Sequence, residues 1–497
     1  MQHLYYSSLY YGLTLILSSF SLTVSAEVAP LAPVDNSPES FEKLTSEVHP
    51  ETIKRLATKL PSEAPQAQMT KAESLIYLKE NPAEFEILLG LLLKQGNSAA
   101  LRDLLQLYRQ IPNYDPSVLD WGEAVIKAKN GQLDEAITIY RRINAKLPDV
   151  KILRFQMAMA LFYNRQFEAA KSEFEKLRSS TVLQEDIAVI NSYLEAINEQ
   201  GSWEFNGSLS YVNDSNLTNG PKQGTKLEGG NGNSVTYTSP PESGKGVDFA
   251  LSGDKKWFYD NKVFTALHLN SYGHYYWDNK KFNDMTAGLG VGVGYQNVTT
   301  EVELTPFYNK RWYGGGTNGS DSLKSYADTT GVKASLGQWL SPQWRYQGLI
   351  RWAQAEYADS YRYNDGDEQL YANTLIYMPN HKQFWTLGAD YLRKDAESDA
   401  DSFTRKGGRV SWGQTWPKGY STQVSLGYGE RDYKGENFFG IKRENQEYSA
   451  DVTLWNRDFH LMSLTPRFSW NYQKVSSNSV FEEYSKNGVS VELTKSF

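Results

Sequence analysis

Residues Val489-Ser490-Val491-Glu492-Leu493-Thr494-Lys495-Ser496-Phe497 alternate between apolar and polar side chains, apart from Lys495. In an extended strand such residues point to opposite faces. A strand that separates lipid from an aqueous lumen needs this pattern, because one of its faces meets each environment. We therefore expect a membrane-spanning strand that ends on an aromatic residue. We interpret its outward set as a signal for outer-membrane barrel assembly, and the set comprises Val491, Leu493 and Phe497.

The same alternation recurs in aromatic-rich segments of about ten residues from Trp203 to the C-terminus. Of the 13 tryptophans, only Trp121 precedes this region. An even number of strands places both ends of a bacterial barrel in the periplasm. We count fourteen candidate strands, at residues 203–213, 246–257, 262–275, 283–297, 300–311, 323–339, 343–357, 368–378, 382–394, 403–416, 419–430, 442–455, 459–474 and 484–497.

The links between these candidates alternate in length, as the short periplasmic turns and long external loops of outer-membrane barrels do. Short turns are expected at 259–261, 297–299, 341–342, 379–381, 417–418 and 456–458. Longer loops are expected at 213–244, 312–322 and 431–441. A soluble β-sandwich has no reason to keep this alternation in phase. We therefore predict a C-terminal outer-membrane β-barrel of about 14 antiparallel strands over residues 203–497.

Composition excludes several functions. The net charge of -7 and the lack of a dense Lys/Arg stripe argue against a nucleic-acid partner. With no cysteine, the chain cannot form disulfides or thiolate metal sites and cannot carry a lipid-modified N-terminal cysteine. We expect no cofactor and no bound metal. Beyond the N-terminus no apolar run is long enough for a spanning helix, so any crossing uses strands.

The N-terminus predicts export. An apolar stretch from Leu13 to Val24 precedes Val24-Ser25-Ala26, a small-x-small pattern that a signal peptidase cleaves. The alternative, an uncleaved anchor, needs a longer apolar run. We predict a signal peptide over residues 1–26 and a flexible periplasmic segment over residues 27–70, which is rich in Pro, Glu, Ser and Ala.

Residues 71–200 carry a helical pattern with an internal repeat. Residues 130–136 align with 164–170 at an offset of 34 residues, which is the period of the tetratricopeptide repeat. We expect three aligned pairs to pack the helices together, and they are Gln132 with Gln166, Ala136 with Ala170, and Tyr140 with Phe174. Residues 96–108 resemble a third copy, and 181–198 a capping helix. Such arrays bind extended peptides or partner domains; the alternative is a scaffold that only positions the barrel.

Two features of the barrel region could suggest chemistry. Residues 288–294 contain glycine at every second position, which no phosphate-binding loop does. These glycines either relieve crowding at a curved strand or leave room for a plug or a passing polypeptide. His268 and His274 share one face of a strand, but no Ser–acid pairing accompanies them in the sequence. We therefore predict that the chain is not an enzyme.

Two sequence patches resemble the surface lipoprotein assembly modulator (Slam) family, which joins tetratricopeptide-like repeats to a C-terminal barrel. The first patch is residues 211–219, YVNDSNLTN, and the second is residues 306–315, PFYNKRWYGG. The candidates for family-motif residues, or for contact with a transported client protein, are Asn213, Asp214, Asn216, Asn219, Arg311, Trp312, Gly314 and Gly315. The alternative roles are structural: capping of loop backbone in the first patch, and an aromatic-girdle pair followed by a plain turn in the second.

The resemblance implies an outer-membrane translocation factor of a Gram-negative bacterium, with its repeats in the periplasm. Its partners would be a client protein, outer-membrane lipid, the barrel assembly machinery and periplasmic chaperones. Clients would be surface lipoproteins or secreted haem- or iron-binding proteins. One alternative is an exopolysaccharide or small-solute exporter, which predicts a lumen of uniform charge. Another is a barrel anchor whose repeats only scaffold envelope partners.

Overall fold

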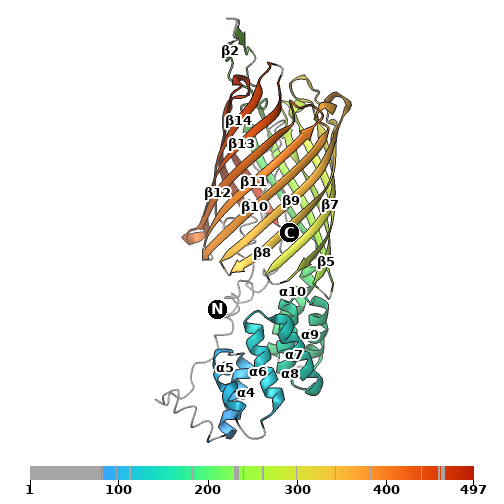
Figure 1. Ribbon diagram of the computed structural model, residues 1–497, viewed down its shortest axis with the longest axis vertical. Helices are drawn as coiled ribbons and strands as arrows, with labels where there is room; N and C mark the ends of the chain where they lie inside the picture. The colour runs from blue at the N-terminus through green and yellow to red at the C-terminus, as the bar shows by residue number, and fades with distance from the viewer. Residues whose placement is uncertain are drawn as a thin grey trace.

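A computed structural model describes residues 80, 82–96, 98–110, 114–180, 184–228, 234–238, 240–259, 262–297, 299–341, 343–380, 382–437, 439–456, 459 and 465–496. In these ranges a helical domain precedes a closed β-barrel along one long axis (Figure 1). The expected signal peptide and the segment 27–70 lie outside the described residues. No helix in the described ranges combines the length and apolarity that a membrane crossing requires.

The helical domain consists of consecutive helices that pack as antiparallel neighbours. Its described helices are α4 (Pro82–Gln95), α5 (Ser98–Tyr108), α6 (Pro116–Lys129), α7 (Leu133–Lys146), α8 (Lys151–Tyr163), α9 (Phe167–Ser180) and α10 (Gln184–Gln200). α6 begins where the Asp115 side chain accepts a hydrogen bond from the Ser117 backbone N–H at 2.8 Å, with Pro116 in the first helical turn.

The 34-residue offset relates α6–α7 to α8–α9. Ala136 and Ala170 are both fully buried, as are Tyr140 and Phe174, so the aligned positions occupy the contact between helices. The turns are equivalent as well, because Gly131 and Arg165 both have positive φ, at 81° and 61°.

The aligned glutamines do not pack between helices, contrary to our expectation. Gln132 is exposed and bonds Glu135 at 3.0 Å, while Gln166 is half-buried and accepts from Arg141 at 3.1 Å. Both side chains lie at the start of a helix, where the surface turn holds them away from the core.

The barrel contains fourteen antiparallel strands, which confirms the expected fold. The closed order is β1-β16-β15-β14-β13-β12-β11-β10-β9-β8-β7-β6-β5-β4. The strands are β1 (Glu204–Asp214), β4 (Gly244–Phe258), β5 (Val263–Tyr276), β6 (Asp284–Gln296), β7 (Thr300–Tyr313), β8 (Lys324–Ser341), β9 (Trp344–Tyr357), β10 (Gly366–Asn380), β11 (Gln383–Ala396), β12 (Phe403–Thr415), β13 (Tyr420–Glu436), β14 (Lys442–Asn456), β15 (Thr465–Ser477) and β16 (Tyr484–Ser496).

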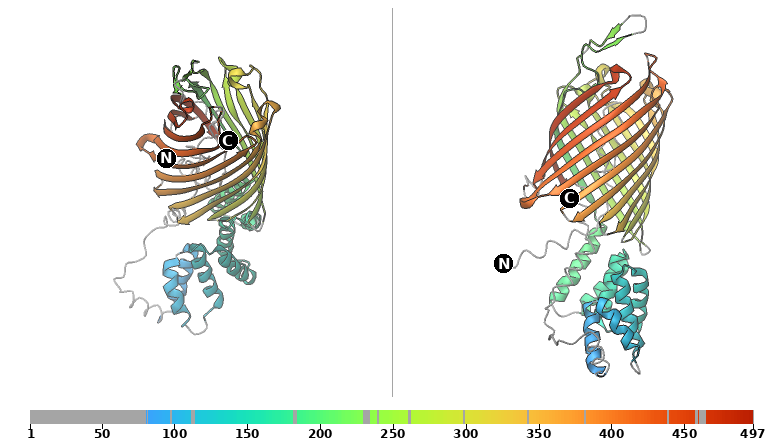
Figure 2. Two further views of the ribbon diagram at one scale, coloured as in Figure 1. Left: turned by 45° about the horizontal axis from the view of Figure 1, so that its top comes forward. Right: turned by 60° about the vertical axis from the view of Figure 1, so that its left-hand side comes forward.

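Several details differ from the sequence expectation. β13 continues to Glu436, so the loop expected at 431–441 is shorter, and the described part of β15 begins at Thr465. The long loop after β1 contains a small hairpin of β2 (Lys226–Glu228) and β3 (Ser234–Thr236). The hairpin extends beyond the barrel end that is opposite the helical domain (Figures 1 and 2).

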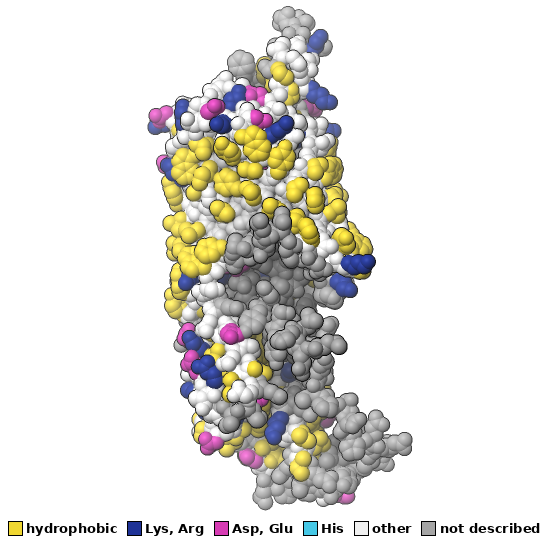
Figure 3. Space-filling view, turned by 180° about the vertical axis from the view of Figure 1, so that it is seen from behind, with side chains coloured by type: hydrophobic (Ala, Val, Ile, Leu, Met, Phe, Trp, Pro, Cys, Tyr) yellow, Lys and Arg dark blue, Asp and Glu magenta, His cyan; other side chains and the backbone are white. Residues whose placement is uncertain are grey.

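The outer wall of the barrel is apolar, and its inner wall is polar. Large hydrophobic residues face outward on every second strand position; examples with 54–60% exposure are Leu251, Val291, Leu387 and Leu426. Figure 3 shows one face of the barrel, on which hydrophobic side chains form a broad surface below a rim that carries Lys, Arg, Asp and Glu. This distribution matches a wall in lipid, because the exposed apolar area would otherwise face water.

Replacing Val291 by arginine tests the lipid-facing assignment. Val291 lies near the middle of β6 and is 54% exposed. An arginine on the lipid face near mid-bilayer costs about 2–4 kcal/mol of barrel stability. We expect Val291→Arg to lower the fraction of protein that migrates as the folded barrel in gel electrophoresis of unheated samples. Val291→Leu should leave that fraction unchanged. Equal folding of both variants would contradict the assignment.

Candidate functional site

The helical domain contacts the barrel at the β4–β5 turn. Phe258, at the end of β4, packs against the hydrophobic core of the helical domain. Its ring meets Phe167 edge-on, with centroids 5.2 Å apart. Phe167 is the first residue of α9, so the turn between α8 and α9 is the part of the repeat that faces the barrel.

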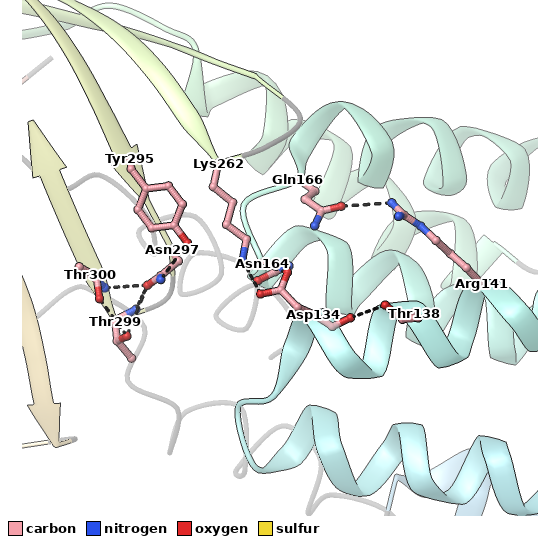
Figure 4. A network of polar contacts seen from close by, with 10 residues as sticks. All are labelled: Asp134, Thr138, Arg141, Asn164, Gln166, Lys262, Tyr295, Asn297, Thr299 and Thr300. Atoms are coloured by element: carbon pink, nitrogen blue, oxygen red, sulfur yellow. Dashed lines mark hydrogen bonds and ion pairs between the residues drawn. The ribbon is translucent and has the colours of Figure 1, made fainter.

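Polar contacts also join the β4–β5 turn to the helical domain, and Figure 4 shows them. The ammonium of Lys262 lies 2.7 and 2.9 Å from the two carboxylate oxygens of Asp134, on α7. The Asn164 amide also donates to Asp134, at 2.7 Å. Lys262 is only 8% exposed, whereas the Asp134 side chain is 68% exposed, so the covered ammonium is compensated by a carboxylate at the edge of the contact. The two repeat turns and the barrel turn therefore form one docking contact.

The electrostatics of Asp134 follow from this position. Partial burial raises its pKa, but hydrogen bonds from Lys262 and Asn164 lower it more, so the pKa lies below the ordinary value of 3.8. Because the pKa is lowered in the docked state, the full contribution of Asp134 to docking is present above the ordinary pKa of 3.8. The contribution is lost as the pH falls through the lowered pKa.

The lumen wall near this end holds a buried acidic cluster around one histidine. The two ring nitrogens of His268 lie 2.7 Å from Asp254 and 2.7 Å from Glu303. Two of the alternating glycines of β6 face these side chains, because a Cβ would lie 2.2 Å from the Glu303 carboxylate at Gly292 and 3.6 Å from the His268 Cβ at Gly290. The glycines therefore relieve crowding by the neighbouring strands, as the first of our two interpretations predicted.

A second cluster, on β11 to β14, is built from arginines. Arg405 bonds Glu447 at 2.8 Å and also pairs with Asp390, while Arg431 reaches the other Glu447 oxygen at 2.7 Å. Arg405 and Arg431 are fully buried. The lumen therefore carries both signs of charge in fixed pairs, unlike the uniform lumen that an exporter predicts. In the described ranges, no His, Cys, Asp and Glu side chains group in a way that could hold a metal ion.

The first family-like patch lies at the end of β1 away from the helical domain. Asn216 is 7% exposed; its side chain accepts from the Gly220 N–H at 3.2 Å and donates to the Gly220 carbonyl at 2.8 Å. Asp214 accepts from the Asn216 N–H at 2.8 Å, and Asn219 has a positive φ of 48°. These contacts cap the loop backbone. Asn213 is exposed on the outer face.

The second patch is split by the barrel wall. Arg311 points into the lumen, where its Nε donates to Asp284 at 2.8 Å and its guanidinium lies 4.7 Å from the Tyr326 ring centroid. Trp312 follows it on the strand and points the other way, so the interpretation of the two as a girdle pair is wrong for Arg311.

Gly314 and Gly315 form the tight turn that follows β7. Gly315 has a φ of 104°, and a Cβ on Gly314 would lie 2.4 Å from the Lys281 carbonyl oxygen. Both positions therefore require glycine for the backbone to pass.

The C-terminal strand is described as far as Ser496. Val491 faces outward at 38% exposure, and Leu493 pairs with Leu209 of β1. Phe497 lies outside the described residues. The role of these three residues in barrel assembly stays a prediction.

Sequence reasoning did not find the docking contact or the arginine cluster. Phe258 was a usable signal, because it occupies an inward position where the pattern expects a polar side chain. No sequence signal pointed to Lys262 and Asp134, because a lysine in a turn and an acidic residue early in a helix are ordinary surface residues. Arg405 and Arg431 were also hidden, because alternation alone does not reveal which charges meet across strands.

Comparison with known families decides the identity. Residues 203–497 match the model of the surface lipoprotein assembly modifier, and residues 72–174 match the model of the N-terminal TPR repeats of the same proteins. The chain belongs to the surface lipoprotein assembly modifier family. It is therefore an outer-membrane β-barrel protein of this family, with tetratricopeptide-type repeats before the barrel.

Family members from several bacteria are similar over most of their length. The chain is 38% identical to surface lipoprotein assembly modifier 1 of Haemophilus influenzae, over 81% of this chain and 82% of that protein. It is 34% identical to the surface lipoprotein assembly modifier of Pasteurella multocida, over 94% and 93%. It is 23% identical to the hemophilin secretion modulator of Acinetobacter baumannii, over 87% and 89%.

The docking contact makes a testable prediction. Asp134→Asn leaves the buried Lys262 ammonium without a carboxylate, so the helical domain should move more freely on the barrel. Labels on Glu175 and Gln343, both exposed, report the separation of the two domains by electron–electron resonance. We expect a broader distribution of label distances for Asp134→Asn than for the labelled protein that keeps Asp134. In that labelled protein the distribution should also broaden as the pH falls below 3.8.

The control is Glu135→Gln. Glu135 neighbours Asp134 but pairs with Lys127 inside the helical domain, so its loss should leave the distribution unchanged. A distribution for Asp134→Asn that matches that of the unaltered protein would show that the ion pair does not hold the domains together.

Proposed function

We propose that this chain delivers client proteins across the outer membrane, from the periplasm to the cell surface or the medium. The observation that carries the proposal is the docking contact. It fixes a repeat array of a peptide-binding type against one end of a barrel whose lumen is polar. A client bound by the repeats would therefore lie beside the barrel opening.

The client class follows from the family. Relatives are named for surface lipoprotein assembly and for hemophilin secretion. We propose that the clients of this chain are surface lipoproteins or secreted haem- or iron-binding proteins. The periplasmic chaperones would keep such clients unfolded, and the barrel assembly machinery would insert the protein itself.

The lumen chemistry suits passage of an extended polypeptide. In the arginine cluster, charges of both signs are paired with one another, as in the Arg405–Glu447 contact, so these charges need no ion from the client. A wall of this kind offers hydrogen bonds to a peptide backbone without holding one sign of charge tightly. Transport requires no bond to be made or broken, so we propose no catalytic role for His268 or His274.

The direct test is surface exposure of a client. A lipoprotein client and this chain are produced together in a Gram-negative host that lacks both, and intact cells are treated with protease. We expect the client to be cleaved only when the chain is present. Clients that stay protected with and without the chain would overturn the proposal and favour the exporter or scaffold functions.

A lumen obstruction separates translocation from scaffolding. Ser449 and Ala450 are neighbours on β14, and their partners Gly427 and Leu426 place the first in the lumen and the second on the lipid face. We expect Ser449→Trp to lower client exposure to a minority of the unaltered level, because the ring narrows the lumen. The matched control Ala450→Trp should retain exposure. Full activity of both variants would support a scaffold whose lumen is not used.

A further inference from the structure

The joint between β1 and β16, where the barrel closes, has the shortest pairing among the described barrel strands. It comprises six residue pairs, from Asn206–Ser496 to Tyr211–Val491. Each of the other neighbouring strands shares 11 to 14 pairs. Because barrel strands in lipid are held by their mutual hydrogen bonds, this joint is the one that parts with the fewest broken pairs.

The missing pairs lie on the side of the joint away from the helical domain. Residues 212–214 of β1 pair with β4 but have no described partner on β16. Residues 484–490 of β16 pair with β15 up to that level and have no described partner on β1. The joint is therefore zipped near the helical domain and unzipped toward the opposite rim.

One ion pair and one cavity occupy the unzipped part. The Lys486 ammonium on β16 lies 2.9 Å from the Asp214 carboxylate on β1, and both side chains are mostly buried. A cavity of about 230 Å³ adjoins them. Its lining includes Ser490, which faces the lumen, and also Asn213 and Val489, which face outward. Most of the lining faces the lumen, including Asp248 of β4 and Asp284 of β6, so the cavity lies inside the barrel beside the joint.

The two faces of the joint differ in polarity. The outer face is apolar, since Val489 is 65% exposed and Tyr211 44% exposed, and Trp470 pairs beside Val489. The inner face is lined by Asp248, Asn471 and Lys486. A molecule with an apolar end and a polar end could therefore place its apolar end at the outer face of the joint and its polar end at the inner face.

We propose that the β1–β16 joint is a lateral exit for the acyl chains of a lipidated client. The inference rests on the proposed function. The client polypeptide occupies the polar lumen, and its lipid chains pass between β1 and β16 into the outer leaflet. The six pairs from Asn206–Ser496 to Tyr211–Val491 close the rest of the joint, so it must unzip further to admit acyl chains. The Asp214–Lys486 pair holds it closed between clients.

A disulfide across the last pair of the joint tests this exit. The chain has no cysteine, so Tyr211→Cys with Val491→Cys creates a single possible bond. Directly opposed residues of antiparallel strands lie about 4.5–5.5 Å apart at Cα, within the range that a disulfide spans. The matched control joins Tyr211→Cys to Val247→Cys on β4, where β1 is already fully paired.

Two forms of one client are compared, the lipoprotein and a variant whose acylated N-terminal cysteine is replaced. With the β1–β16 disulfide oxidised, we expect the lipoprotein to lose protease accessibility on intact cells, and a reductant to restore it. The unlipidated form should reach the medium as it does with the unaltered chain. The β1–β4 control should handle both forms normally.

Two results would overturn the lateral exit. In the first, the lipoprotein reaches the surface with the β1–β16 bond fully oxidised. In the second, the bond stops both client forms equally, which would assign the joint to polypeptide passage. Failure of the unaltered chain to move either form would instead overturn the proposed function itself.

Discussion

The structure depends on one constraint: a backbone surrounded by lipid must find all its hydrogen bonds within the protein. Closure of fourteen strands meets that constraint, and it also fixes the strand order and the side of the wall on which each residue lies. The apolar outer face of Val291 and the polar inner face of Glu303 both follow from it. The number of residue pairs still varies from one joint to the next, and among the described barrel strands the β1–β16 joint has the fewest.

Closure creates a narrow interior in which large side chains must fit together. On β6, glycine at alternate positions makes room for His268 and Glu303 from the strands beside it. On β11 to β14, Arg405 and Arg431 share the Glu447 carboxylate, so buried charge is compensated locally. The same interior ends at Phe258 and Lys262, whose contacts with α7 and α9 set the position of the helical domain. The β4–β5 turn thus couples the barrel to the repeats.

The sequence was most informative where a period governs the structure. Alternation with period two predicted the fourteen strands, and the 34-residue offset predicted the equivalence of α7 and α9, because both periods result from regular backbone geometry. Strand ends were less predictable: β13 extends beyond the expected turn residues through Arg431, whose buried ion pair lies inside the barrel. The docking contact and the β1–β16 joint could not be predicted, since they join residues far apart in the chain without any periodic pattern.

The family-like patches illustrate the same limit. Their residues could be recognised, but Asn216 caps a loop and Arg311 pairs with Asp284, so the structure gives both of them structural contacts. Their participation in client contact stays a prediction.

Site-specific photo-crosslinking of a client in transit tests the central claim, that the client passes through the barrel lumen. Asn309 faces the lumen and its neighbour Tyr308 is 42% exposed on the outer face, so the two positions differ only in the side of the wall. A photo-reactive residue at position 309 should form an adduct with a stalled client, and one at position 308 should not. A client that reaches the surface without ever forming an adduct at lumen positions would contradict the account.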